Sequence, residues 1–528
     1  MRKYLAVMES RRKILPMILL LIALTVVLFF SFAFNGLRVV PDWFYTRFQM
    51  DSETLVYSNI IAEQQGLPLS RGNLGRVILK NNLSPEDVVY NAEAILSIKN
   101  GTTHRLTPCN PDDIKLDQTD NALCVDPSVY MDIQHLIGCE LIVNNEIRVI
   151  KQIVDRNTHV EIQYYGVKFA SETINEILVK EVFHPEYIDR NINTYTSQYG
   201  IQGKIFAYLY NKCHLSLTKL HQLVAFSTAL VLSILTMAIM VYISPIFGLC
   251  FFITILLSPW VVSFSRNLYW IEFSWWLPAV FTFLMVDKEK NTYFYLALFC
   301  LGIFFKSLAG YEYLSTIVLF AMSPYIIKAF LEKQLTEKIV AVKVIFQIGL
   351  LSVFSFICAL ALHCYIMTEG DVLNGLRSIW VDTVLRRTYG DPHAFIDPML
   401  KQSLEVPAID VIKTYIFQWH TDLIKFIPGK AFPILVSIAL LCCLSAFVQN
   451  RIHDCKKYVA YLFTFCLPPL SWLFLAKGHS FIHLHMNYVL WYFGFLPALF
   501  YIILHESLLM SERVVFQVML KIKNCSKF

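Results

Sequence analysis

The chain is long and rich in apolar residues. It has 528 residues, of which 56% are hydrophobic and only 16% are charged, and its formal net charge is +5. An ordinary soluble domain carries roughly 25% charged residues, and the basic residues here stand in short clusters between apolar runs. The composition therefore excludes an ordinary soluble protein and argues against nucleic acid as a partner. It predicts an α-helical polytopic membrane protein.

Apolar runs near the length that crosses ~30 Å of hydrocarbon define about ten predicted membrane spans. The first has a basic flank before it and no small-residue cleavage site after it, so we expect an uncleaved anchor and not a signal peptide. In chain order the predicted spans are residues 14–34, 217–243, 246–263, 270–286, 292–306, 314–329, 342–367, 430–448, 458–476 and 487–505.

The basic residues of the short loops predict the orientation of these spans. If ten spans alternate, the Lys and Arg residues that follow spans four, six, eight and ten all fall on the side of the N-terminus. By the positive-inside rule that side is cytoplasmic, so both termini are expected there. The residues are Lys288, Lys290, Lys333, Lys338, Lys343, Arg451, Lys456, Lys457, Arg513, Lys521, Lys523 and Lys527.

This orientation predicts five parts of the chain, two of which are large external loops. They are the N-terminus with the first span (1–34), a large external loop (35–216), spans two to seven (217–367), a second external loop (368–429), and spans eight to ten with a cytoplasmic tail (430–528).

The first external loop contains a stretch with strand-like alternation, GCELIVNNEIRVIKQIVDRNTHVEIQYYGV, from Gly138 to Val167. The pairs Asn144-Asn145 and Arg156-Asn157 suit hairpin turns between β-branched residues. We therefore predict a small α+β insertion in this loop. An oxidising exterior would also permit a disulfide between Cys109 and Cys124, which flank a segment rich in Pro and Asp.

Two acidic residues follow the first span, in RFQMDSETLVYSNIIAEQQGLPLS. Asp51 and Glu53 stand at the start of a predicted amphipathic helix that ends at Gly66 and Pro68. A carboxylate at the membrane edge can act as a general base toward a hydroxyl or ligate a divalent cation. The alternative is an acidic pair that only stabilises a helix N-terminus.

Three other external segments carry ionisable or polar groups beside apolar runs, where such groups are expensive unless paired or wetted. The alternatives to a functional role are a Lys306–Glu312 ion pair, snorkelling of Lys306, and a solvated face for the arginines. The guanidinium group otherwise suits phosphate binding. The candidates are Arg266 and Asn267, then Lys306, Tyr311 and Glu312, and finally Arg386 and Arg387.

The segment GHSFIHLH places three histidines between two apolar runs. His479 and His483 are four residues apart and would share a face of a helix, whereas His485 would not. A zinc site would need a third ligand and usually a nearby carboxylate, which the local sequence lacks. Two interpretations stay open, histidines in a hydrated loop and a polar patch that contacts the phosphate of a lipid carrier.

The order of these features resembles the GT-C class of integral-membrane glycosyltransferases, of the hexosyltransferase-like, bacterial surface-polysaccharide kind. The resemblance rests on a short N-terminus, a large external loop whose acidic residues Asp51 and Glu53 follow the first span, and the run NTYTSQYGIQGKIF before the second. It implies that Asp51 and Glu53 are catalytic, as base or metal ligand, and that a divalent cation is compatible with the site.

The resemblance also implies the partners and the location. The donor would be a polyprenyl-phosphate-linked sugar, the acceptor a glycan or lipid, and the site would face outward from the bacterial inner (plasma) membrane. Arg266, Lys306, Arg386 and His479 would then hold the leaving phosphate. A polysaccharide polymerase, a transporter or flippase for lipid-linked glycans, and a non-enzymatic assembly factor are the alternatives. Charge-poor spans and the absence of an internal repeat speak against a transporter.

Overall fold

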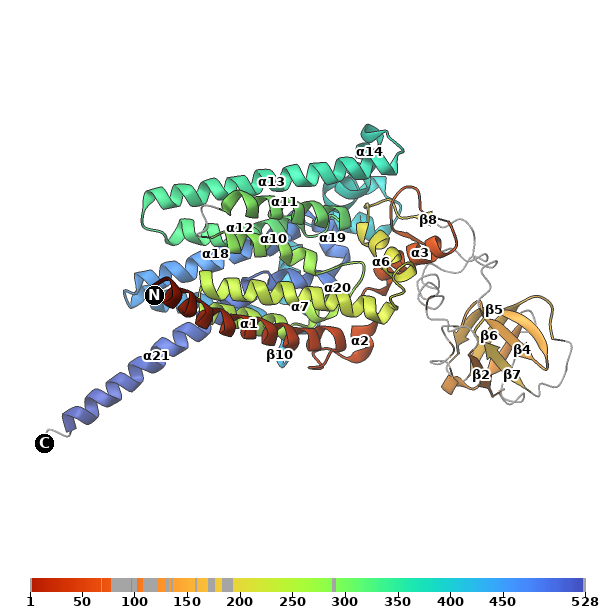
Figure 1. The fold of residues 1–528 in the computed structure, drawn as a ribbon, viewed down its shortest axis with the longest axis horizontal. Coiled ribbons are helices and arrows are strands. Elements are labelled where there is room, and N and C mark those ends of the chain that lie inside the picture. Colours follow the sequence, from red (N-terminus) through yellow and green to blue (C-terminus); the bar gives the residue numbers. More distant parts are fainter. Residues whose placement is uncertain are drawn as a thin grey trace. The chain divides into compact units, whose positions relative to one another are not determined.

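A computed structural model describes residues 2–67, 69–76, 96, 102–107, 121–129, 133, 136–156, 159–169, 176–182, 193–286 and 291–525 (Figure 1). The chain forms two compact units. The first comprises Met1–Phe48, Ser197–Tyr199 and Thr218–Phe528, and the second comprises Gln49–Thr196 and Gly200–Leu217. Each unit is described by itself.

The first unit is built from helices. Its long or apolar helices are α1 (Arg2–Phe34), α7 (Leu217–Tyr242), α8 (Pro245–Leu256), α10 (Phe273–Met285), α11 (Thr292–Ala309), α12 (Leu314–Leu331), α13 (Leu335–Met367), α17 (Phe432–Val448), α18 (Ile452–Leu475) and α21 (Phe495–Cys525). Its short elements are α2 (Asp42–Arg47), α9 (Pro259–Phe264), α14 (Val372–Ile379), η5 (Trp380–Tyr389), η6 (Pro392–Ala394), α15 (Pro398–Glu405), α16 (Ala408–Phe417), β9 (Asp422–Ile424), β10 (Ile427–Pro428), η7 (Gly429–Ala431), α19 (Lys477–Ile482), α20 (Leu484–Asn487) and η8 (Tyr488–Tyr492).

Within the described residues, eight helices are long and apolar enough to cross a membrane, and α8 and α10 are shorter apolar helices. The chain is therefore an α-helical polytopic membrane protein. The third predicted span, 246–263, is two helices and not one. Ser258 accepts a hydrogen bond from the Val261 N–H at 3.0 Å and Pro259 follows it, so α9 starts anew where α8 has ended.

The last predicted span begins later than expected. Residues 487–492 complete α20 and form the 3-10 helix η8, and the long helix α21 starts only at Phe495. Between them Gly494 has a φ of +92°, a conformation that side-chain-bearing residues rarely adopt. The polar segment before this point is therefore folded into short helices and is not a simple loop.

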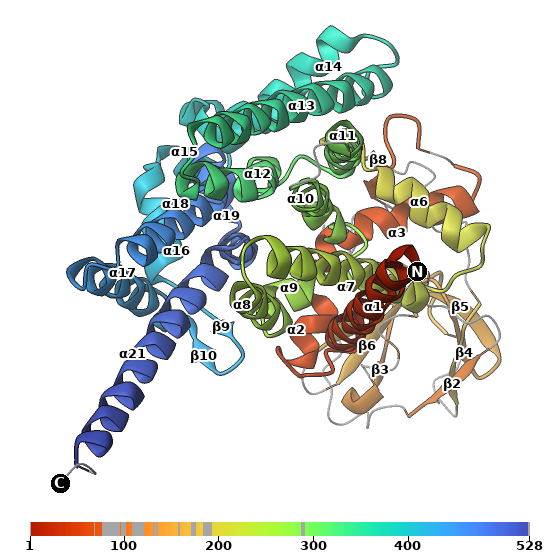
Figure 2. The ribbon, with the colours of Figure 1, turned by 60° about the vertical axis from the view of Figure 1, so that its left-hand side comes forward.

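The turns between the helices of the first unit lie at two opposite ends, as expected if successive spans run in alternating directions. The start of α1, the α12–α13 turn and the α17–α18 turn lie at one end, and α14 and α19 lie at the other (Figure 1). The α12–α13 turn is closed by an ion pair between Lys328 Nζ and Glu337 Oε2 at 3.0 Å. Figure 2 shows α12 packed between α13 and α18.

The second unit contains helices α3 (Met50–Gln64) and α6 (Ile201–Asn211), which pack on one another, and an antiparallel six-stranded sheet. Its strands, in spatial order, are β2 (Thr103–Leu106), β7 (Ile177–Lys180), β4 (Glu140–Val143), β5 (Glu146–Asp155), β6 (Val160–Tyr165) and β3 (Ala122–Val125). A short pair joins β1 (Gly75–Arg76) to β8 (Asn193–Thr194), and η2 covers Pro127–Val129.

The alternation in the sequence explains this sheet. Strand β6 alternates buried and half-buried residues, and apolar side chains from all six strands form one core. Strands β4 and β5 form the predicted hairpin, in which Asn144 and Asn145 have φ values of +46° and +70°, as a two-residue type I′ turn requires. Cys109 lies outside the described residues, so the predicted Cys109–Cys124 bridge stays a prediction.

Helix α3 ends where the sequence predicts but is buried differently. The N–H of Leu67 donates to the Ala62 carbonyl at 2.9 Å and that of Gly66 donates to Glu63 at 3.2 Å, which is a Schellman ending. The predicted amphipathic helix with one exposed polar face is wrong, because every residue from Glu53 to Ala62 is buried. The polar residues in this stretch are thus covered together with the apolar ones.

Candidate functional site

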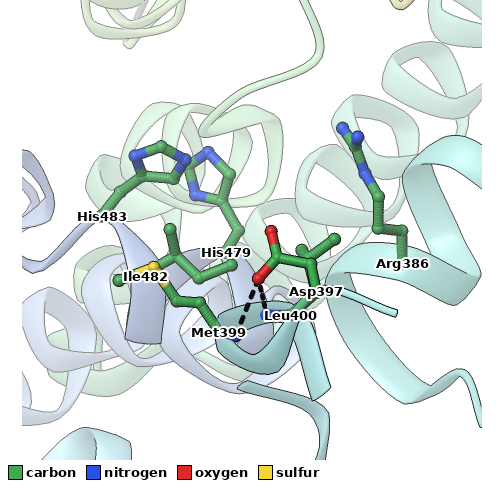
Figure 3. A pocket seen from close by; sticks show the side chains of 7 residues that line it. All are labelled: Arg386, Asp397, Met399, Leu400, His479, Ile482 and His483. Atoms are coloured by element: carbon green, nitrogen blue, oxygen red, sulfur yellow. Dashed lines mark hydrogen bonds between the residues drawn. The ribbon is translucent and has the colours of Figure 1, made fainter. Parts of the chain in front are cut away.

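A pocket of about 250 Å³ in the first unit brings together two segments that the sequence analysis singled out separately. Figure 3 shows the side chains that line it, from η5, from the start of α15, and from α19 and the residue after it. They are Arg386, Asp397, Met399, Leu400, His479, Ile482 and His483. We call this the Arg386 pocket.

Arg386 is presented by an unusual helix. After α14 the chain continues as a ten-residue π-helix, η5, and the N–H of Gly390 closes its last turn on the Leu385 carbonyl at 2.8 Å. Such helices are rare and are frequently found at functional sites. The side chain of Arg387 lies outside the described part of the chain.

Asp397 also lines the pocket, and the sequence analysis did not single it out. Its Oδ1 accepts hydrogen bonds from the N–H groups of Met399 at 2.8 Å and Leu400 at 3.4 Å, which caps α15 (Figure 3). The Asp-Pro step of Asp397 and Pro398 is a recognisable helix start. That signal predicts a cap, but nothing in it predicts that the cap faces two histidines some 80 residues further along the chain.

The rings of His479 and His483 lie next to each other at an interplanar angle of 42°. The ring centroids of His479 and His483 are 4.5 Å apart, and His479 also lies edge-on to Trp472 at 5.8 Å. His479 is buried and His483 is half-buried, whereas His485 is exposed, with its ring 5.8 Å from that of His483. Two imidazoles thus reach the Arg386 pocket, and the third lies outside its lining.

Lys477 fastens the walls of the pocket together. Its ammonium group donates to the carbonyls of Leu404 at 2.7 Å and Val406 at 2.9 Å, at the end of α15, and lies 5.5 Å from the ring centroid of Tyr389 in η5. Burial lowers the pKa of this lysine. Because both carbonyls are satisfied from α19, the three elements of the pocket are held in one arrangement.

Tyrosines strengthen the same connection. Tyr415 donates to the Ser480 carbonyl at 2.7 Å, and Tyr389 donates to the Phe474 carbonyl at 3.1 Å. Tyr488 donates to Gln418 as well. The second predicted external loop is therefore bound to the segment around α19 by side-chain-to-backbone hydrogen bonds at several points along its length.

Arg266 and Asn267 do not line this pocket. The Arg266 guanidinium lies 5.0 Å from the ring centroid of Tyr45, and the two groups attract each other as a cation and a π face. Asn267 is buried, and its Oδ1 accepts hydrogen bonds from the N–H groups of Tyr269 at 3.0 Å and Trp270 at 3.1 Å. Both residues shape the turn between α9 and α10.

Lys306, Tyr311 and Glu312 form a different group, which with Gly310 and His363 we call the Gly310 cluster. Lys306 is only 3% exposed and donates to the Gly310 carbonyl at 2.6 Å, so it turns inward to close α11 and does not snorkel. Tyr311 Oη lies 2.7 Å from His363 Nδ1. The Glu312 carboxylate is buried, and a Cβ at Gly310 would collide with it.

Asp51 and Glu53 belong to the second unit, and the Arg386 pocket to the first. Asp51 is exposed in the first turn of α3, while Glu53 is 3% exposed. Of the two carboxylates, only that of Asp51 is accessible to an acceptor in solution.

The Arg386 pocket combines hydrogen-bond donors for an anion with an acceptor for hydroxyl groups. The donors are Arg386 and the two histidines, and the acceptor is the carboxylate of Asp397. A guanidinium offers a fork of N–H donors to phosphate oxygens, and an imidazole adds a donor when neutral and a charge when protonated. The described residues contain no group of three or more His, Cys, Asp or Glu that could hold a metal ion. The chain matches no protein-family model, no curated protein and no solved structure.

Proposed function

We propose that the protein is a membrane glycosyltransferase that moves a single sugar from a polyprenyl-phosphate-linked donor to an acceptor glycan or lipid. The observation that carries the proposal is the lining of the Arg386 pocket, where Arg386, His479 and His483 gather from segments about 90 residues apart in the chain. Such a set of donors is suited to a phosphate group that gains charge as it leaves a sugar.

The proposed reaction is one displacement. The acceptor hydroxyl oxygen attacks the anomeric carbon while a general base takes its proton, and the bond from that carbon to the phosphate oxygen breaks. The electron pair stays on the polyprenyl phosphate, whose charge Arg386 and the histidines stabilise. Asp51, whose side chain is exposed, is the carboxylate tested for the role of base, whereas Glu53 is buried. Single displacement inverts the configuration at the anomeric carbon.

The same proposal assigns an orientation. The turns that carry Lys333 and Arg451 are basic and lie at the end of the first unit opposite α14 and α19 (Figure 1). By the positive-inside rule those turns are cytoplasmic, as are both termini. The Arg386 pocket then faces outward from the plasma membrane, where a carrier lipid presents its sugar to surface glycans.

The test compares surface glycans, by mass spectrometry, from cells with the gene, without it, and with the Asp51→Asn or Arg386→Ala variant. The proposal predicts that deletion removes one sugar unit and that each variant reaches the membrane but behaves like the deletion. A change only in glycan chain length or amount would favour a polymerase or a transporter. Unchanged glycans in all cells would overturn the proposal.

A further inference from the structure

Helix α14 has three distinct faces. With 3.6 residues per turn, Leu373, Leu376 and Trp380 fall within a sector of about 60°, and they are 80%, 37% and 58% exposed. Gly375 and Ile379 are buried on the neighbouring sector. The remaining sector is polar and exposed, with Asn374, Arg377 and Ser378. An exposed apolar stripe between a buried face and a basic polar face is typical of helices that lie in a membrane interface.

The packing of α14 places it at the level of a membrane boundary. It starts five residues after α13 ends at Met367 and folds back on that span. Gly375 touches Cys364, in the last turn of α13, so closely that a Cβ there would lie 2.8 Å from the Cys364 Cα. α13 itself exposes apolar side chains, among them Phe354 at 64% and Ile357 at 55%. α13 and α14 thus both expose apolar side chains to their surroundings.

We propose that α14 is an interfacial helix and that the stripe of Leu373 and Leu376, together with Trp380 at the start of η5, is embedded among lipid acyl chains. Its polar face, with Arg377, then meets the head groups, where a cation is attracted to anionic lipids. η5 continues from α14 without a break and ends near Arg386. The consequence is that Arg386 sits at head-group depth. This inference does not depend on the reaction assigned above.

Photocrosslinking in nanodiscs tests this directly. p-Benzoylphenylalanine replaces Leu373 or Leu376 on the stripe, and Asn374 or Ser378 on the polar face serve as matched controls on the same helix. The full-length protein is reconstituted with a phosphatidylcholine that carries a clickable acyl chain, and lipid adducts are counted by mass spectrometry. We expect several-fold more adduct at the two stripe positions than at the two controls.

Two outcomes would overturn the proposal. Equal labelling at all four positions would mean that the stripe is not selectively in lipid. Crosslinks from Leu373 or Leu376 to a second copy of the chain, in place of lipid, would identify the stripe as a protein interface. A second measurement uses the Leu376→Gln variant. Because this substitution changes one exposed side chain, it tests lipid contact without disturbing the fold. It should leave the melting temperature in detergent unchanged and weaken quenching of Trp380 by brominated lipid, with Trp380→Phe as the blank.

Discussion

The Arg386 pocket and the Gly310 cluster lie at the same end of the first unit, yet they use their ionisable side chains differently. In the Gly310 cluster, Lys306 donates inward to a carbonyl and Tyr311 meets His363. In the Arg386 pocket, the guanidinium and two imidazoles line a cavity. A polar residue beside an apolar run therefore signals either closure of a helix end or a binding site.

The difference comes from what lies within reach of each side chain. Lys306 is in the last turn of α11, where carbonyls lack helical partners and a cation is favoured. Lys477 likewise donates hydrogen bonds to two carbonyls at the end of α15. Arg386, His479 and His483 instead line a cavity that a ligand can enter. The comparison gives four predictions.

The largest effect is expected for Arg386→Ala, which removes a phosphate donor from the pocket. Loss of one such preorganised donor lowers a turnover rate by about 100-fold, and we expect that loss in sugar transfer measured with purified enzyme in nanodiscs. Lys413→Ala is the control, because it removes an exposed positive charge that lies outside the pocket lining. Equal loss in both variants would mean that general charge, and not the pocket, governs transfer.

Lys477→Met should destabilise the fold around the pocket. It leaves the buried carbonyl of Leu404 and the half-buried carbonyl of Val406 without their donor, at a cost of roughly 2–4 kcal/mol in the free energy of unfolding. The melting temperature in detergent should fall, and Lys477→Arg should restore part of it. A Met variant as stable as the wild type would show that the fastening of α15 to α19 is not energetically important.

Lys306→Met should lower the stability of the Gly310 cluster without changing the Arg386 pocket. Loss of the bond to Gly310 costs about 1–3 kcal/mol of stability, but Lys306 lies outside the pocket lining. We expect a lower melting temperature with transfer per folded molecule close to that of the wild type. A variant that is fully stable yet inactive would move Lys306 into the binding site and contradict the distinction.

The smallest effect on stability is expected at Asp397. Asp397→Ala removes the cap of α15 and should cost about 1 kcal/mol, whereas Asp397→Asn keeps an acceptor oxygen for the Met399 N–H. The melting temperature should therefore fall only for Ala. If the carboxylate also binds the sugar, transfer should fall in both variants. Wild-type transfer by the Asn variant would reduce Asp397 to a helix cap.

The sequence predicted the membrane class, most span positions and the Asn144-Asn145 hairpin, because each depends on local patterns. It did not predict the break at Ser258-Pro259 within the third span or the burial of both sides of α3. The break at Ser258-Pro259 was missed because a helix-capping signal there lies within a continuous apolar run, which by itself predicts one uninterrupted helix. The burial of α3 depends on packing between distant segments, which hydrophobic periodicity alone does not record.

The site was predicted in part for the same reason. The four-residue spacing of His479 and His483 is a local pattern, and the two rings do lie close together. Whether Arg386 or Lys306 would join them depends on hydrogen bonds between elements far apart in the chain. Asp397 was missed because its helix-capping role is all that its neighbours reveal.

The most direct test of the account is binding of polyprenyl phosphate to the purified protein in nanodiscs, measured by native mass spectrometry. The wild type and Lys413→Ala should bind the lipid equally, and the Arg386→Ala, His479→Ala double variant should bind it at least tenfold more weakly. Equal binding by the double variant, with its fold intact by melting temperature, would contradict the claim that the Arg386 pocket holds the phosphate of a carrier lipid.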